Sequence, residues 1–215
     1  MNKIRIEALS DGVFAIVMTI LVLELKVPHI RGEETSNQLL WQKLIDLWPV
    51  FRSYLISFLI VGMYWLAHSA FFHLFTRQVN RVLANFNTLF LMFVSLIPFS
   101  AHLLGEYPRH YPAILIYGLN IIVVGLILFL MLRLAIHDHE VRHEAVSQRL
   151  IVQATVRVLL PPGFALLGML VAGVNISFSF FLFFFPIVFN LIPGSLDFME
   201  WLIFKRRRKA HQEMP

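Results

Sequence analysis

Arg5, Ser10 and Asp11 are charged or polar side chains that stand at the head of the apolar run "RIEALSDGVFAIVMTILVLELKVP" near the start of the chain. The charge-free part of that run, residues 12–23, makes about 18 Å of helix at about 1.5 Å per residue. That is too short for a hydrocarbon core of about 30 Å. Residues 5–27 make about 34 Å, which spans such a core. The spacing therefore predicts a membrane helix that carries the Asp11 carboxylate inside the membrane region.

In that position, Asp11 needs a partner. A carboxylate that faces lipid costs several kcal/mol, so its side chain should face protein. Arg5 lies six residues away, whereas only neighbours at i+3 and i+4 meet well on one helix. The partner is therefore expected on another helix or another subunit, and candidates at similar depth are His68, His73 and Arg157. Two roles stay open: a structural ion pair that orients the helix, and a step in a proton relay.

A second feature of the same segment is a narrow stripe formed by Gly12, Ile16, Thr19 and Leu23, which share one side at helical periodicity. One interpretation is ordinary helix packing, with the Thr19 hydroxyl bonded to the Ala15 carbonyl. The other is the wall of a pore around a symmetry axis. Rings of Ile or Leu can close such a pore by dewetting, and a ring of Thr hydroxyls can replace part of a cation's hydration shell.

The composition indicates the medium around these residues. Hydrophobic residues make up 58% of the 215, charged residues 14%, and the mean hydropathy is +0.73, whereas a soluble domain carries about 25% charged residues. The chain is therefore an integral membrane protein. It contains no cysteine, which excludes disulfides, zinc–thiolate sites and thiol nucleophiles. The net charge of +5 does not indicate a nucleic-acid partner, because five basic residues cluster at 205–209, directly after an apolar run.

Hydropathy predicts an all-α fold in one domain, residues 1–215, with six transmembrane helices. Their expected ranges are 5–27, 54–75, 82–104, 113–132, 151–174 and 176–204. Pro161, Pro162 and Gly163 are expected to kink or break the fifth span. The connection 29–49 contains "NQLLWQKLIDLW", which predicts an amphipathic helix on the outer membrane surface.

Basic residues set the orientation. Six spans put both termini on one side of the membrane. Thirteen of the 18 Lys and Arg residues fall on that side, and the other side carries Lys26, Arg31, Lys43, Arg52 and Arg109. By the positive-inside rule both termini are cytoplasmic.

The first run resembles the signature of the transmembrane protein 175 family, the lysosomal and bacterial potassium channels. That signature is R-x-x-x-F-S-D followed by G-V-F-A-I-x-x-T-L-L-V-L; here Leu9 replaces the Phe and Ile20 a usual Leu. Trp65, His68 and Phe72 form a W-x-x-H-x-x-x-F arrangement similar to the family's. The run "NFNTLFLMFVSLIPF" is similar to its N-x-x-x-L…PF pattern. The resemblance is specific through residue 99.

This resemblance implies the bacterial, single-repeat form of the channel: a homotetramer of six-helix subunits in the bacterial inner membrane. The first helix would line the pore, which would have no carbonyl-type filter, and the permeant ion would be K⁺ without any cofactor. Ile16 then falls on the hydrophobic constriction, Thr19 on a hydroxyl layer linked to selectivity, and Leu23 on the next apolar ring outward. The family's polar network, which pins the first helix to its neighbours, corresponds to Arg5, Ser10, Asp11 and His68.

Two other classes stay open. A secondary transporter or proton-leak pathway is the main alternative; broken helices near the midplane would favour a transporter, and the Pro161–Gly163 run and Asn85 and Asn87 are its support. A membrane enzyme would need a nucleophile or a metal cluster. His137, His139 and His143 could supply metal ligands but stand in a charged loop.

Overall fold

The computed structural model describes residues 2–29, 36–138, 141 and 146–191, and the structural statements below concern these residues. The elements, in chain order, are α1 (Lys3–Leu21), η1 (Val22–Glu24), α2 (Asn37–Asp46), α3 (Trp48–Phe75), α4 (Arg81–Ser95), α5 (Ile97–Glu106), α6 (Tyr111–His137), α7 (Gln148–Ala172) and α8 (Ile176–Leu191). The all-α prediction is confirmed.

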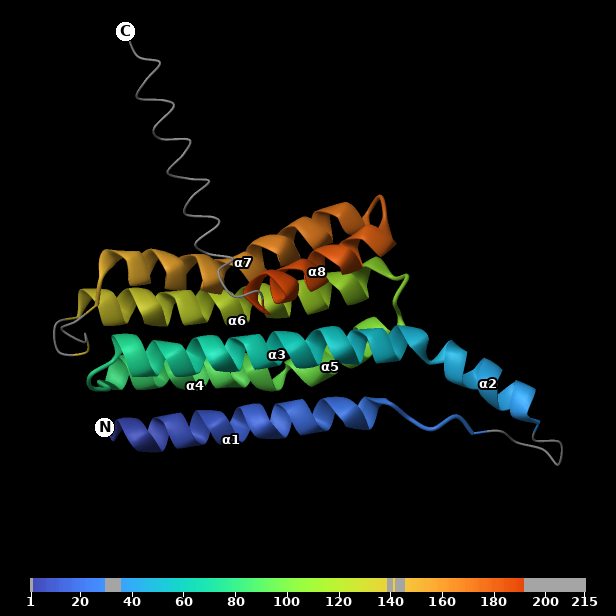
Figure 1. Ribbon diagram of the computed structural model, residues 1–215, viewed down its shortest axis with the longest axis horizontal. Coiled ribbons are helices and arrows are strands. Elements are labelled where there is room, and N and C mark those ends of the chain that lie inside the picture. The colour runs from blue at the N-terminus through green and yellow to red at the C-terminus, as the bar shows by residue number, and fades with distance from the viewer. Residues whose placement is uncertain (1, 30–35, 139–140, 142–145, 192–215) are drawn as a thin grey trace, which may run out of the picture.

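The long helices lie alongside one another as a bundle (Figure 1). α1 lies along one edge, where it contacts α3, α4 and α5. α6, α7 and α8 form the opposite edge, with α6 packed on α7 and α7 packed on α8. α2 projects beyond one end of the bundle. One face of α1 is therefore packed on the rest of the subunit, and the other lies at the margin.

Five helical segments are long and apolar enough to cross a membrane: Lys3–Glu24, Trp48–Phe75, Arg81–Glu106, Tyr111–His137 and Gln148–Ala172. They correspond to the first five predicted spans. The sixth prediction, 176–204, is described only as far as Leu191, and residues 192–204 lie outside the described part. α8 has 16 residues, or about 24 Å of helix, so a sixth span stays a prediction.

Two local features differ from the expected pattern. The predicted span 82–104 is interrupted, because α4 ends at Ser95 and α5 begins at Ile97. Pro98 explains the interruption, since it has no backbone N–H and its ring crowds the carbonyl four residues before it. By contrast, α7 is helical without a break through Pro161 and Pro162. A break at that position is therefore wrong, and the kink named as its alternative stays a prediction.

Gly125 of α6 accommodates these prolines. A Cβ built at Gly125 would overlap Pro162 and lie 2.9 Å from the Tyr64 hydroxyl. Only glycine leaves room for α7 to approach α6 so closely. The missing Cβ of Gly125 thus leaves space on α6 for the Pro162 ring, and α7 stays helical through both prolines.

The helix predicted within residues 29–49 is present as α2, with the Ser36 hydroxyl accepting the Leu39 N–H at its start. Trp41 and Trp48 are 67% and 57% exposed. The apolar residues of α2 are therefore available for contact with a membrane surface, and that position stays a prediction.

Candidate ion pathway and the polar network behind it

α1 divides sharply into a buried and an exposed side. Ile6, Ser10, Phe14, Val17 and Leu21 are buried, and their spacing of three or four residues follows the helical repeat. The Phe14 ring lies 5.8 Å from the His68 ring and 5.9 Å from the Phe90 ring, between centroids. This side of α1 therefore belongs to the core of the subunit.

The predicted stripe lies on the exposed side. Ile16 is 59% and Leu23 is 69% exposed, and Gly12 and Thr19 are exposed as well. A Cβ at Gly12 would meet no atom within 4 Å. The α-helix ends at Leu21, six residues before the predicted end of the span at residue 27, so Leu23 stands on the 3₁₀ turn η1. The four stripe residues still share an uncovered surface.

The Thr19 hydroxyl donates to backbone of its own helix, at 2.8 Å from the Ile16 carbonyl oxygen and 3.0 Å from that of Ala15. This is the local bond expected of a threonine within a helix. Because the proton is used in this way, the oxygen lone pairs remain free to accept from outside. Thr19 therefore offers an acceptor oxygen on an otherwise aliphatic surface.

Behind the stripe, a buried chain of hydrogen bonds joins α3, α4 and α1. His68 Nε2 lies 2.7 Å from Asn87 Oδ1, and Asn87 Nδ2 lies 3.1 Å from Ser10 Oγ. The Ser10 hydroxyl in turn donates to the Ile6 carbonyl at 2.9 Å. His68 and Asn87 are 2% exposed and Ser10 is 0% exposed, so these bonds form away from water.

The donors of this chain all point the same way. Ser10 gives its proton to a carbonyl, so its oxygen accepts from the Asn87 amide. The Asn87 oxygen then accepts from His68 Nε2, which must carry the proton. An amide N–H does not pass its proton on and the chain ends at a backbone carbonyl. The geometry therefore suits a structural role better than a proton relay, and we call Ser10, Asn87 and His68 the buried clamp.

The Asp11 partner differs from the three candidates. Asp11 Oδ1 accepts a 2.8 Å hydrogen bond from the Trp65 indole Nε1. Trp65 stands one turn before His68 on α3, so two neighbouring turns of that helix both reach α1. Arg157 belongs to α7 and lines a groove together with α3, α6 and α8. A neutral indole, rather than a charged group, satisfies the carboxylate.

Arg5 is exposed, and none of the described residues forms a hydrogen bond or ion pair with it. Its place in the polar network therefore stays a prediction. Lys3, which the pattern did not single out, takes the anchoring position at this end. Its ammonium donates to the Thr76 carbonyl at 2.9 Å and lies 4.0 Å from the Glu7 carboxylate.

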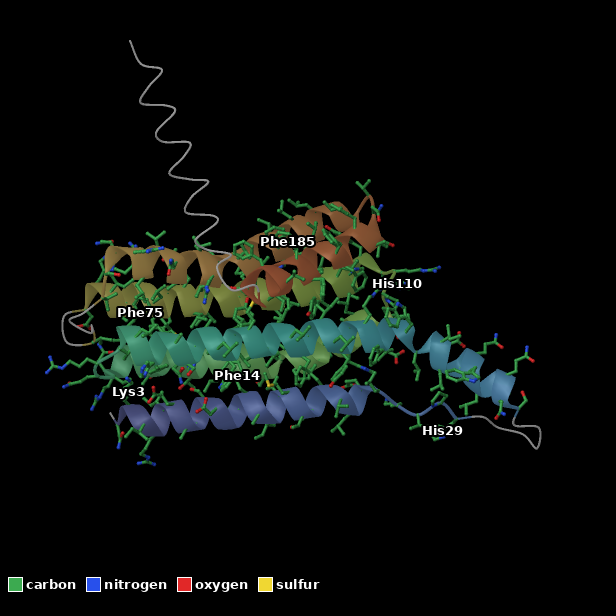
Figure 2. The ribbon with its side chains drawn as sticks, in the orientation of Figure 1. Lys3, Phe14, His29, Phe75, His110 and Phe185 are labelled. Atoms are coloured by element: carbon green, nitrogen blue, oxygen red, sulfur yellow. The ribbon has the colours of Figure 1, made fainter. Side chains whose placement is uncertain are left out.

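A close polar contact lies at the other end of the first span. Glu24 Oε2 on η1 lies 2.6 Å from His102 Nδ1 on α5. With the bonds made by Lys3, Ser10 and Asp11, polar contacts thus fix this span at both ends and near its first third. Figure 2 shows Lys3 near the N-terminal end of α1 and Phe14 further along it, on the side that faces the bundle. This contact had no signal in the sequence, because it depends on how α5 packs.

The loop histidines form no metal site in the described residues, among which no group of three or more His, Asp or Glu side chains could hold an ion. His137 donates from Nδ1 to the Arg133 carbonyl of its own helix at 2.8 Å. His139 and His143 lie outside the described residues.

Residues 5–98 match the family described as the endosomal/lysosomal potassium channel TMEM175. The resemblance to the TMEM175 family thus covers the N-terminal 94 of the 215 residues. The matched segment contains α1, α3 and α4, and hence every residue of the stripe and of the buried clamp.

Named relatives extend this finding. A potassium channel from Streptomyces collinus is 38% identical over 126 residues, which are 57% of this chain and 59% of the relative. One from Chamaesiphon minutus is 43% identical over 106 residues, 49% and 51% of the two chains. The human endosomal/lysosomal proton channel TMEM175 is 36% identical over 113 residues, 51% of this chain and 22% of the human one. This chain thus spans little more than half the length of the bacterial relatives.

The overall fold also has a solved counterpart. The crystal structure of a lysosomal potassium-selective channel TMEM175 homolog from Chamaesiphon minutus superposes with a TM-score of 0.71 at 27% identity. The superposition covers 87% of this chain and 95% of the other. The likeness therefore reaches past residue 98 into the helices that the sequence match leaves out. These relatives are channels, not enzymes, so the enzyme alternative is set aside.

Proposed function

We propose that this chain is the subunit of a potassium-permeable cation channel of the bacterial inner membrane. Four copies surround an axis, each contributes the exposed side of α1 to the pore, and no carbonyl-type filter is present. The family match and the names of the relatives support a cation channel. The observation that carries the proposal is the uncovered stripe on α1.

The stripe suits a pore wall better than a lipid-facing surface in one respect. Its four residues, Gly12, Ile16, Thr19 and Leu23, are small or aliphatic with one hydroxyl. The exposed side of α8, by contrast, carries Phe178, Phe181, Phe184 and Phe185. Small side chains let four helices approach a common axis, whereas the rings of α8 suit the hydrocarbon of the membrane.

The order of the stripe along α1 suggests how ions pass. A ring of four Ile16 side chains excludes water and acts as the constriction. Thr19 stands about 4.5 Å further along the helix, and its free lone pairs replace part of the hydration shell of a cation at that narrow point. Leu23 forms the next apolar ring outward. Selectivity then depends on how well four hydroxyl oxygens replace the water that the apolar rings remove.

A second function keeps the same pore but a different ion. The human, zebrafish and chicken relatives are named proton channels. A proton needs a continuous line of water through the pore, so its passage depends on the wetting of the Ile16 ring. A secondary transporter is less favoured, because α7 is unbroken at Pro161 and Asn87 is used in the clamp.

The test is a reversal potential of the purified full chain in a planar bilayer, with K⁺ on one side and Na⁺ on the other at equal pH. Unitary currents that reverse near the K⁺ equilibrium potential are expected. A reversal that follows an imposed pH gradient would indicate the proton channel. Flux that requires a second ion gradient and never resolves into current steps would contradict a channel.

A further inference from the structure

On the side of α3 away from α1, helices α3, α6, α7 and α8 enclose a groove of about 350 Å³. We call it the α7 groove. Its walls are mainly apolar, including Leu66 and Leu74 of α3 and Leu128 and Leu132 of α6. The volume lies at the lower end of the range of about 300–1,000 Å³ that is typical of ligand pockets. An apolar chain fits these walls.

One cation stands among the described residues of this lining. Arg157 of α7 is exposed, and within the described residues its guanidinium has neither a hydrogen bond nor an ion pair. The amides of Gln153, one turn away on α7, and of Asn190 on α8 also line the groove. A charge inside a membrane segment needs a partner. The groove therefore combines apolar walls with an Arg side chain that an anion would stabilise.

The depth of Arg157 indicates which anion. The residue lies nine positions after Gln148, the first residue of α7, or about 14 Å along a helix of about 37 Å. Long helical side chains lean toward the N-terminus of their helix, which places the guanidinium nearer the membrane surface at that end. By the positive-inside rule this surface is cytoplasmic. Basic pockets between membrane helices on that side bind anionic lipid head groups.

We propose that the α7 groove holds an anionic phospholipid of the cytoplasmic leaflet, with its phosphate on Arg157 and an acyl chain along the apolar walls. The guanidinium matches a phosphate with two parallel hydrogen bonds. The groove lies across α3 from the clamp residues that hold α1, and so a bound lipid would stiffen α3 from the opposite side. This inference does not depend on which ion the protein conducts.

The experiment uses the full chain in nanodiscs with equal amounts of phosphatidylglycerol and phosphatidylcholine, followed by detergent extraction and native mass spectrometry of retained lipid. We expect retained phosphatidylglycerol to exceed phosphatidylcholine, and Arg157→Gln to lower that enrichment about tenfold, as the loss of a charge-assisted hydrogen bond implies. Arg157→Lys should keep part of the enrichment. The matched control is Arg133→Gln, an exposed residue of α6 outside the groove lining, which should change nothing.

A second variant tests the walls independently of charge. Ala70 of α3 is exposed and lines the groove, so Ala70→Leu should reduce retention of both lipids without loss of folding. Added inorganic phosphate should not displace the lipid, which distinguishes a lipid from a free anion. Equal retention of the two lipids by the unchanged protein would overturn the proposal. A lower thermal midpoint of Arg157→Gln in neutral detergent without lipid would also overturn it, because Arg157 would then pair with a carboxylate of the protein.

Discussion

α1 and α8 both expose apolar side chains along one side, yet they are attached to the bundle in different ways. α1 and its 3₁₀ turn are tied by Lys3, Ser10, Asp11 and Glu24 to carbonyl, amide, indole and imidazole groups of other elements. α8 is attached mainly by rings. Phe183 packs edge-on against Tyr117 at 5.2 Å, and the Arg52 guanidinium lies 3.6 Å above the Phe180 ring.

The two attachments suit two different exposed surfaces. Hydrogen bonds are directional, so a helix that makes several of them is fixed in rotation and in height. Ring packing restricts the rotation and the height of a helix less strictly. A narrow stripe must point at an axis with little error, whereas a Phe-rich face can meet lipid at many angles. Polar contacts on a membrane helix therefore mark the helix whose orientation matters.

Breaking the clamp tests this comparison most strongly. Asn87→Leu removes both bonds of the amide, so that His68 Nε2–H loses its acceptor and Ser10 Oγ keeps only its bond to the Ile6 carbonyl. Each buried group left unsatisfied costs about 1–3 kcal/mol. The proposed tetramer should be lost, or the thermal midpoint of the protein strongly lowered, as measured by size exclusion and unfolding in detergent.

The matched control for this prediction lies on α8. The Ser179 hydroxyl is buried and bonds to none of the described residues, so Ser179→Ala should be neutral or slightly stabilising. A Ser179→Ala loss equal to that of Asn87→Leu would remove the distinction between the two helices.

Opening the constriction is expected to have the next largest effect. Ile16→Asn places an amide on the exposed stripe, which should let water enter the constriction that we propose at this position. Current per channel should rise by about tenfold, equivalent to a barrier lower by about 1.4 kcal/mol. Val22→Asn is the control, because Val22 is also exposed, at 46%, but stands off the stripe. If both variants conduct alike, the stripe has no special place in the pathway.

Removing the hydroxyl should have a smaller effect on ion choice. Thr19→Val keeps the shape of the side chain but deletes the acceptor oxygen, and Thr19→Ser keeps the oxygen. The preference for K⁺ over Na⁺ should fall several-fold in the first variant and persist in the second. Reversal potentials under K⁺/Na⁺ gradients measure this. Identical values for Val and the unchanged protein would leave Thr19 with only its bonds to Ala15 and Ile16.

The smallest expected effect concerns the exposed link of Asp11. Trp65→Phe deletes the indole N–H and should lower the stability by about 1 kcal/mol, or roughly 2–4 °C in the thermal midpoint. Asp11→Asn retains an acceptor oxygen and should lose less. In the double variant the two losses should not add, because they remove one bond. Full additivity would show that Trp65 and Asp11 act separately.

The stripe on α1 could be predicted from periodicity, because a 3.6-residue repeat depends only on local sequence. The hydrogen-bond partner of Asp11 on another helix could not be predicted in this way. Similar depth in the membrane predicts His68, His73 or Arg157 as the partner of Asp11, but the Trp65 indole donates the hydrogen bond to its carboxylate. The reason is that a hydrogen bond from a neutral donor satisfies a carboxylate at less desolvation cost than a second charge.

Proline effects also depended on neighbours that the sequence does not place. Pro161 and Pro162 predicted a kink or a break, yet α7 stays helical through them, and Gly125 of α6 leaves room for the Pro162 ring. Pro98 stands in a segment of unbroken hydropathy, and there the helix is interrupted. Hydropathy finds a span, but the packing around a proline decides whether the helix continues.

Gly12 lends itself to chemical labelling. It lies on the stripe, a Cβ there would meet no atom within 4 Å, and the whole chain contains no cysteine. Gly12→Cys would therefore place a single thiol per copy on a background that needs no prior substitution. Its reaction with water-soluble reagents would report directly on the solvent that reaches this face. An oxidised pair of such thiols would measure how closely two copies approach.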